Sequence, residues 1–159
     1  MNKKLLILGC GYSAQFISKK LIAEGWRVFG TTRSREHFKK FEEFQIEPVS
    51  WSDISAFKYL ATEGCALLSS IAPRGSNDDG LARIEDLLQD ERSNFTWFGY
   101  LSSTGVYGDR KGGWVTEDSK SDTINPQGKA RLEAEKQWLK LADTCSIPLF
   151  IFRLAGIYG

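Results

Sequence analysis

Short apolar runs alternate with amphipathic segments along the chain, and this order is what most limits the folds open to it. Runs rich in branched and aromatic residues predict strands at 4–8, 26–32, 45–51, 65–72, 95–103 and 147–159. The third is the weakest, because Pro48 interrupts it. Apolar side chains at helical spacing predict helices over 13–24, 34–41, 78–89 and 125–141. Alternating strands and helices imply a mostly parallel sheet covered on both faces.

Composition narrows the class of protein. The 159 residues suit one domain, and the net charge of +1 is spread without a basic stripe, so we expect no nucleic-acid partner. We expect no membrane span either, and the apolar run at 5–8 is shorter than a secretory core, so a cytoplasmic location is expected. Cys10, Cys65, Cys145 and His37 show no metal-ligand spacing, which favours reduced thiols and no metal.

A glycine motif follows the first predicted strand and opens the first predicted helix. The stretch Gly9-Cys10-Gly11-Tyr12-Ser13-Ala14 has the form G-x-G-x-x-A. In that pattern Gly9 makes a tight turn, Gly11 lets a pyrophosphate approach the backbone, and Ala14 lets the helix pack on the strand. We therefore predict a Rossmann-like αβα sandwich whose dinucleotide phosphates meet the start of this helix, near Tyr12 and Ser13. A glycine-rich turn without a ligand is the alternative.

The residues after the second predicted strand bear on the choice of dinucleotide. They are Thr31-Thr32-Arg33-Ser34-Arg35, where an NAD site would carry an acidic residue. Arg33 can pair with a 2′-phosphate, and the hydroxyl of Thr32 can assist. The pattern favours NADP over NAD, while a solvated arginine at a helix start is the plainer interpretation.

Four stretches, "ILGCGYSA", "YLSSTGVYG", "NPQGKARLEAE" and "FRLAGIYG", come in the order typical of a known family. Together they resemble the extended short-chain dehydrogenases/reductases, the NAD-dependent epimerase/dehydratase family. The resemblance implies that Ser103 hydrogen-bonds a substrate oxygen. It also places Gln127 and Arg131 where the family has its catalytic tyrosine and lysine. The chain therefore resembles an atypical branch that lacks the standard Tyr-x-x-x-Lys dyad.

A second Tyr-x-x-x-Lys spacing occurs at Tyr107 and Lys111, in the stretch "VYGDRK". A helix holds residues i and i+4 on one face, but these two are separated by Gly108 and followed by Gly112-Gly113. We expect a loop over 104–124 rather than a working dyad, with Tyr107 lining the pocket near the nicotinamide. Gln127 has no proton to exchange near neutral pH, whereas Arg131 stays charged and can bind a ribose or an oxyanion. Two ordinary solvated helix residues are the alternative for Gln127 and Arg131.

Three hypotheses about function remain open at this point. The first is an NADP-dependent oxidoreductase or epimerase on a carbonyl or sugar-nucleotide-like substrate. The second is a catalytically silent domain that binds or senses NADP(H). The third treats the chain as a cofactor domain whose C-terminal substrate region is missing, because family members continue past the "RLAGIYG" stretch. In that case we expect exposed apolar side chains around Phe150, Phe152 and Ile157, and a homodimer.

Overall fold

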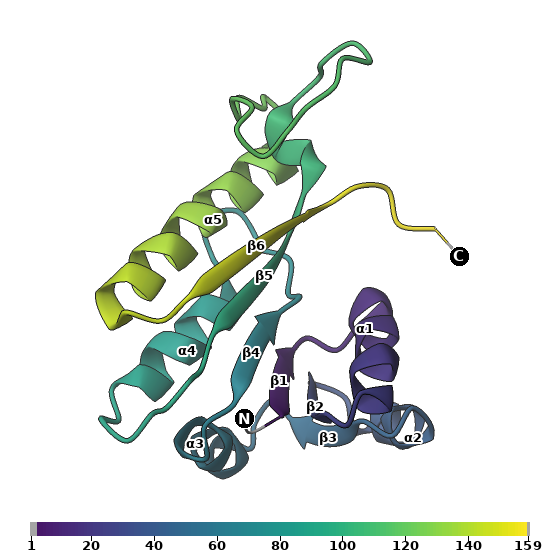
Figure 1. Cartoon of the computed structure of the whole chain (residues 1–159), viewed down its shortest axis with the longest axis vertical. Helices are drawn as coiled ribbons and strands as arrows, with labels where there is room; N and C mark the ends of the chain where they lie inside the picture. The colour runs from purple at the N-terminus through teal and green to yellow at the C-terminus, as the bar shows by residue number, and fades with distance from the viewer. Residues whose placement is uncertain (1–2, 159) are drawn as a thin grey trace.

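A computed structural model describes residues 3–158 of the chain. In chain order the elements are β1 (Lys4–Leu8), α1 (Tyr12–Ala23), β2 (Arg27–Thr32), η1 (Arg35–His37), α2 (Phe38–Glu43), β3 (Glu47–Ser50), α3 (Ile54–Thr62), β4 (Ala66–Ser69), α4 (Asp79–Leu88), β5 (Phe98–Ser103), η2 (Thr104–Tyr107), α5 (Pro126–Cys145) and β6 (Leu149–Leu154). The two η elements are short 3₁₀ helices (Figure 1).

The strands form one sheet in the order β3-β2-β1-β4-β5-β6, and every adjacent pair is parallel. The order reverses between β1 and β4, so the connections leave the sheet in opposite directions there. In open parallel sheets a ligand binds outside the carboxyl ends of the strands at such a reversal. The fold therefore predicts a ligand site at the carboxyl ends of β1 and β4.

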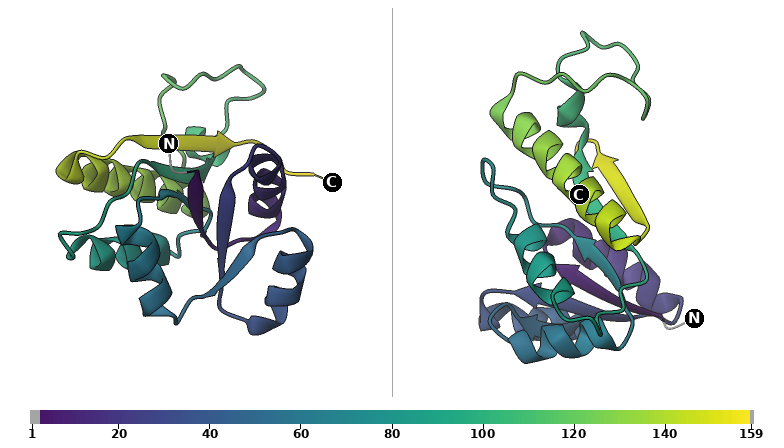
Figure 2. Two further views of the ribbon diagram at one scale, coloured as in Figure 1. Left: turned by 60° about the horizontal axis from the view of Figure 1, so that its bottom comes forward. Right: turned by 90° about the vertical axis from the view of Figure 1, so that its left-hand side faces the viewer.

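Helices cover the two faces of the sheet and make it the middle of three layers (Figure 2). One apolar core lies between the sheet and α3, α4 and α5, and contains Phe57, Ile84, Tyr100 and Trp138. The other lies between the sheet and α1 and α2, and contains Ala14 and Phe41. This arrangement confirms the Rossmann-like αβα sandwich expected from the sequence.

The structure differs from the predicted elements in particular places. The helix α3 was not predicted, and the segment expected as one helix over 34–41 is divided into η1 and α2. The last strand ends at Leu154 rather than 159, and Gly159 lies outside the described residues. Pro48 does lie within a strand, because β3 is at the edge of the sheet, where a missing N–H is tolerated.

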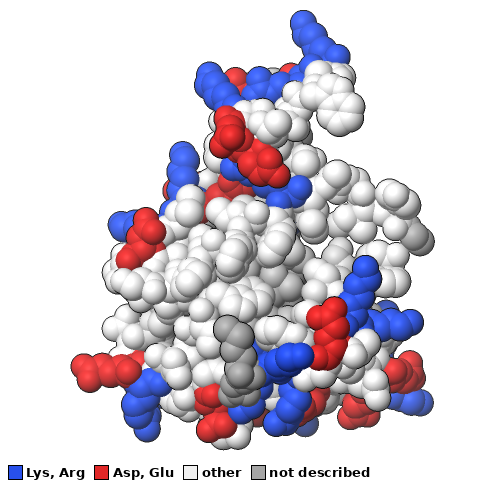
Figure 3. Space-filling model, in the orientation of Figure 1, with Lys and Arg blue, Asp and Glu red and all other residues white. Residues whose placement is uncertain are grey.

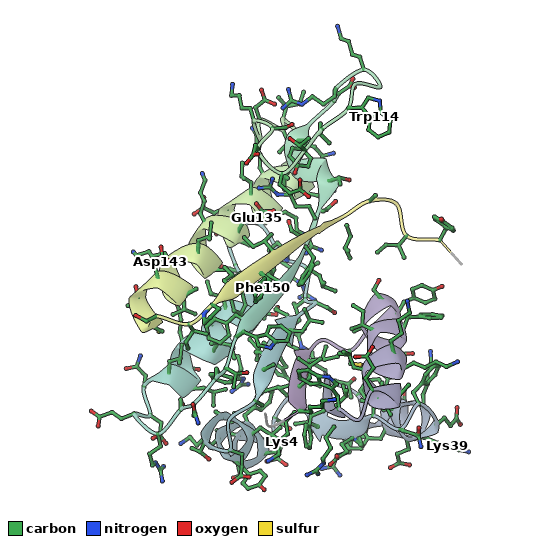
Figure 4. The ribbon with its side chains drawn as sticks, in the orientation of Figure 1. Lys4, Lys39, Trp114, Glu135, Asp143 and Phe150 are labelled. Atoms are coloured by element: carbon green, nitrogen blue, oxygen red, sulfur yellow. The ribbon has the colours of Figure 1, made fainter. Side chains whose placement is uncertain are left out.

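The segment between η2 and α5 extends away from the sheet (Figure 1). It carries Trp114, whose side chain is fully exposed at the end of this projection (Figure 4). Arg110 joins the two sides of the segment through an ion pair with Asp122 at 2.8 Å. The loop predicted over 104–124 is confirmed in its main part, with η2 occupying the first four residues.

Candidate functional site

The turn after β1 leaves free space above the backbone where α1 begins. Gly9 has φ of +72°, and a Cβ added to it would come within 2.7 Å of Ile71. A Cβ on Gly11 would meet only the Gly9 carbonyl, at 3.9 Å, so the space beside it is open. Gly11 caps α1 without a side-chain hydrogen bond, and Ala14 packs in the core. Uncapped N–H groups beside open space fit a phosphate.

A groove of about 610 Å³, called here the Arg33 groove, runs from this turn across the ends of β2, β3 and β4. Arg33 donates to the carboxylate of Asp79 at 2.5 Å, and its guanidinium lies over the Trp51 ring, 5.8 Å from the centroid. The Thr32 hydroxyl contacts Nδ1 of His37 at 3.1 Å. Lys40 and Arg74 also line the groove. Thr32 and Arg33 thus lie in one groove with the glycine turn.

A smaller pocket of about 350 Å³, the glycine-turn pocket, lies on the other side of the turn. Its lining joins the start of α1 to the end of β5 and to α5; it includes Gly9, Gly11, Tyr12, Ser13, Ser103 and Arg131. A third pocket of about 580 Å³, the Gln127 pocket, shares Ser103 and Arg131 and adds Gln127 and Asp109. The structure therefore connects most of the predicted site residues through two adjoining pockets.

Arg131 is held against β5 on one side and borders both of these pockets on the other. Its Nη1 donates to the Leu101 carbonyl and lies 3.5 Å from the Tyr100 hydroxyl. Ser103 accepts a hydrogen bond from the Gly105 N–H at 3.1 Å, so its own hydroxyl proton is left for a ligand. Gln127 is exposed, and it lines the Gln127 pocket but not the glycine-turn pocket.

Tyr107 does not line either pocket, contrary to the expectation that it lies near the nicotinamide. It is buried, and its hydroxyl accepts a hydrogen bond from Arg153 at 2.9 Å. It borders a separate cavity under the 108–124 segment, beside β6. Lys111 lies outside any helix with φ of +51°, which agrees with the prediction that Tyr107 and Lys111 do not share a helix face. Tyr107 is the last residue of η2, and its hydroxyl contacts Arg153 on β6.

A largely buried hydrogen-bond network joins β5, α5 and β6 next to the pockets. Glu135 lies on α5 (Figure 4). Its carboxylate is almost fully buried and pairs with Arg153 of β6 at 2.8 Å. The Ser102 hydroxyl donates to the same carboxylate at 2.5 Å. These contacts hold the end of β5, and with it Ser103, against α5 and β6.

Burial changes the acidity of two groups close to the site. It raises the pKa of the Tyr100 hydroxyl to about 12, although the neighbouring charge of Arg131 opposes the shift. It also raises the pKa of the Cys10 thiol to about 11. Both groups are therefore neutral at physiological pH and supply no anion beside the pockets. Among residues 3–158, no three His, Cys, Asp or Glu side chains gather as a metal site.

Reasoning from the sequence missed several residues of the Arg33 groove. Trp51 follows β3, Arg74 follows β4, and Asp79 begins α4, so they reach the groove from three separate places. The available signal was their position after strands, since the carboxyl ends of parallel strands meet at one edge. None of the segments carries a motif that would have singled these residues out.

The parallel sheet, the open glycine turn and the grooves along the carboxyl edge define a Rossmann-like fold of the kind that carries nicotinamide dinucleotides. The chain has the fold of the NAD-dependent epimerase/dehydratase family. Its structural neighbours include the UDP-glucuronic acid 4-epimerase from Bacillus cereus in complex with NAD, with a TM-score of 0.76 over 98% of this chain, 57% of that chain and 17% identity. At that identity the likeness concerns the fold.

Other relatives are nearer in sequence. A conserved protein of unknown function from Silicibacter pomeroyi is 35% identical, with a TM-score of 0.83 over 99% of this chain and 55% of that chain. A proposed NAD-dependent epimerase/dehydratase from Methylobacillus flagellatus is 26% identical, with a TM-score of 0.77 over 100% of this chain and 56% of that chain. Protein YeeZ of Escherichia coli is 25% identical over 99% of this chain.

The chain spans 60% of the length of that curated relative and about 55% of the solved structures. No family model matches the chain. None of the helices within residues 3–158 has the length and apolar character needed to cross a membrane.

Proposed function

We propose that this chain binds NADP(H) across the carboxyl edge of its sheet, in preference to NAD(H). The observation that carries the proposal is the open space at Gly11 beside the uncapped start of α1. The pyrophosphate would bind there, the adenosine in the Arg33 groove and the nicotinamide in the glycine-turn pocket. When bound, the dinucleotide would supply or accept a hydride.

The choice of NADP(H) is supported by the charges along the Arg33 groove. Arg33, Lys40 and Arg74 line it, against the single carboxylate of Asp79. A 2′-phosphate carries about two negative charges, and arginine binds such groups through charge-assisted hydrogen bonds. Because Arg33 is already paired with Asp79, the phosphate must compete with that carboxylate, which limits the preference.

Catalytic turnover is a second candidate, supported by the position of Ser103. Its free hydroxyl proton and the Arg131 guanidinium border the same pocket as the glycine turn, so both can hold a carbonyl oxygen near the nicotinamide. We expect no standard proton donor, because the resemblance places Gln127 where the family has its tyrosine, and Tyr107 borders a different cavity. On this basis the binding role is the stronger proposal, and any epimerase or reductase activity on a carbonyl or sugar-nucleotide-like substrate would need a proton from water.

Calorimetry with NADPH on the wild type, Gly11→Ala and Gly11→Val tests the binding role. We expect binding by the wild type, weaker binding by Gly11→Ala and none by Gly11→Val, because the larger side chain fills the approach of the pyrophosphate. Circular dichroism checks that each variant is folded. Equal affinity of wild type and Gly11→Val would rule out this position for the phosphates, and no binding by wild type would end the proposal.

A further inference from the structure

We propose that the Gln127 pocket binds the carboxylate of a small organic acid, with Arg131 as its charged ligand. The acid would lie beside the nicotinamide end of the groove, so its place relative to the cofactor rests on the proposed function. Three observations support this assignment: an arginine without a carboxylate partner, a set of unused hydrogen-bond donors, and a pocket of about 580 Å³ next to the glycine-turn pocket.

The first observation is the unpaired charge of Arg131. Arg131 forms no ion pair among residues 3–158, a property that it shares with Arg35, Arg74 and Arg83, and its guanidinium lies 5.9 Å from the centroid of the Tyr100 ring. Its Nη1 is used by the Leu101 carbonyl, and no hydrogen bond engages Nε or Nη2 within the described chain. A guanidinium keeps its charge at any physiological pH, and its fork matches the two oxygens of a carboxylate.

The second observation is that two side chains beside this charge, Ser103 and Gln127, have free donors. Ser103 already accepts from the Gly105 N–H, which leaves its hydroxyl proton free. The Gln127 side chain is exposed and has no hydrogen-bond partner within residues 3–158. Asp109 is the acidic residue of the lining, and its carboxylate accepts from the Lys111 N–H at 2.7 Å. A carboxylate offers only acceptors and therefore complements such a set.

The position of the pocket separates this acid from the phosphates of the cofactor. The open, uncapped N–H groups of α1 border the glycine-turn pocket, not the Gln127 pocket. At the start of α5 the side chain of Asn125 already accepts from the N–H groups of Gln127 and Gly128. An anion in the Gln127 pocket would therefore be held by side chains, with Arg131 first among them.

The experiment titrates the folded protein with pyruvate and follows the ¹H–¹⁵N signals of Arg131 Nε and the Gln127 side-chain amide, first without and then with saturating NADPH. Pyruvamide is the neutral control, because it keeps the carbonyl and loses the charge. We expect pyruvate to shift both signals and to bind at least about tenfold more tightly than pyruvamide, as loss of a charge-assisted pair implies. Arg131→Gln should lose this difference, and Arg131→Lys should keep part of it.

Lys129→Gln is the matched control, because it removes the same charge from an exposed position of α5 that lines neither pocket. It should bind pyruvate like the wild type. Equal binding of pyruvate and pyruvamide, or undiminished pyruvate binding by Arg131→Gln, would overturn the assignment.

Inorganic phosphate is tested in parallel. If it binds better than pyruvate and NADPH displaces both, Arg131 serves a cofactor phosphate and the inference is wrong. If NADPH does not bind, the proposed function is wrong. The difference between pyruvate and pyruvamide binding, measured without cofactor, then still tests whether the Gln127 pocket binds a carboxylate.

Discussion

At Arg33, the proposed 2′-phosphate would compete with Asp79 for one guanidinium. Asp79 holds it at 2.5 Å, and a 2′-phosphate would need the same donors. Since Arg33 is more than half exposed, each such contact is worth about 1 kcal/mol or less in water, roughly a fivefold change in affinity. The charges of Arg33 and Asp79 nevertheless fix whether a substitution at either residue raises or lowers the affinity for NADPH.

We predict opposite effects for two substitutions at this pair. Arg33→Ala should lower the ratio of NADPH to NADH affinity, because it removes the phosphate's partner. Asp79→Asn should raise the ratio, because it removes the competing carboxylate. Calorimetry with both dinucleotides measures the two ratios. A wild type that binds NADPH and NADH equally, with no change in either variant, would contradict the role of Arg33.

Tyr107→Phe separates the structural role of this phenol from a catalytic one. Loss of the hydrogen bond to Arg153 should lower the free energy of unfolding by about 1 kcal/mol, measured in urea. NADPH affinity should not change, because Tyr107 lies outside the pockets assigned to the cofactor. A large drop in NADPH affinity, with stability preserved, would instead assign Tyr107 to the cofactor site.

At the scale of elements, α5 and β6 are joined by the buried pair of Glu135 and Arg153. Removing one member of a fully buried pair costs about 3–5 kcal/mol. Because Arg153 is 22% exposed and also donates to Tyr107 and to the Glu117 carbonyl, the cost of losing Glu135 should fall at the lower end of this range, about 3 kcal/mol. We predict a loss of this order for Glu135→Ala in urea unfolding. Glu133→Ala is the control on the same helix; its exposed contact with Lys136 is 3.8 Å long, and its loss should change stability by less than about 0.5 kcal/mol. Similar effects of the two substitutions would refute the importance of the buried pair.

The sequence predicts the elements that carry strong local signals and misses those formed by tertiary contacts. The glycine turn was found because its spacing has a direct conformational cause at Gly9 and Gly11. Helix α3 is an exception, because it was missed although it has local signals too, a cap at Asp53 and apolar residues Phe57 and Leu60 at helical spacing. The Arg33 groove could not be derived in full, because Trp51 and Asp79 meet there only through the order of the strands.

At the scale of the whole molecule, one face of β6 is uncovered. Phe150, Phe152 and Ile157 are 53%, 45% and 60% exposed, which confirms the apolar surface expected there. Phe150 lies near the start of β6 (Figure 4), and the surface over this strand is largely uncharged (Figure 3). Exposed apolar patches of this kind often mark an interface.

We predict that the protein binds an apolar dye and self-associates at micromolar concentration through this face, as measured by light scattering. Phe150→Ser with Phe152→Ser should reduce both. Tyr59→Ser, which changes an equally exposed aromatic residue on α3, should reduce neither. A monomer that binds no dye would mean that this surface does not mediate association in solution, and the prediction of a homodimer would be wrong.

The whole molecule should also lose stability at alkaline pH. Burial raises the pKa of Cys65 and of Tyr100 to about 12 and that of Cys10 to about 11. The unfolded chain releases these protons at lower pH than the folded chain, so stability falls as the pH rises above about 9. Urea unfolding at pH 8 and pH 10 should show a lower midpoint at pH 10, with a smaller difference in Cys65→Ala. A midpoint that does not move would contradict the buried, neutral state of these groups.

A crystal structure of this chain grown with NADPH tests the central claim most directly. The account predicts density for the pyrophosphate against Gly11 and the start of α1, for the 2′-phosphate near Arg33, and for the nicotinamide beside Ser103 and Arg131. Density for the dinucleotide elsewhere on the surface, or an empty carboxyl edge at saturating NADPH, would contradict it.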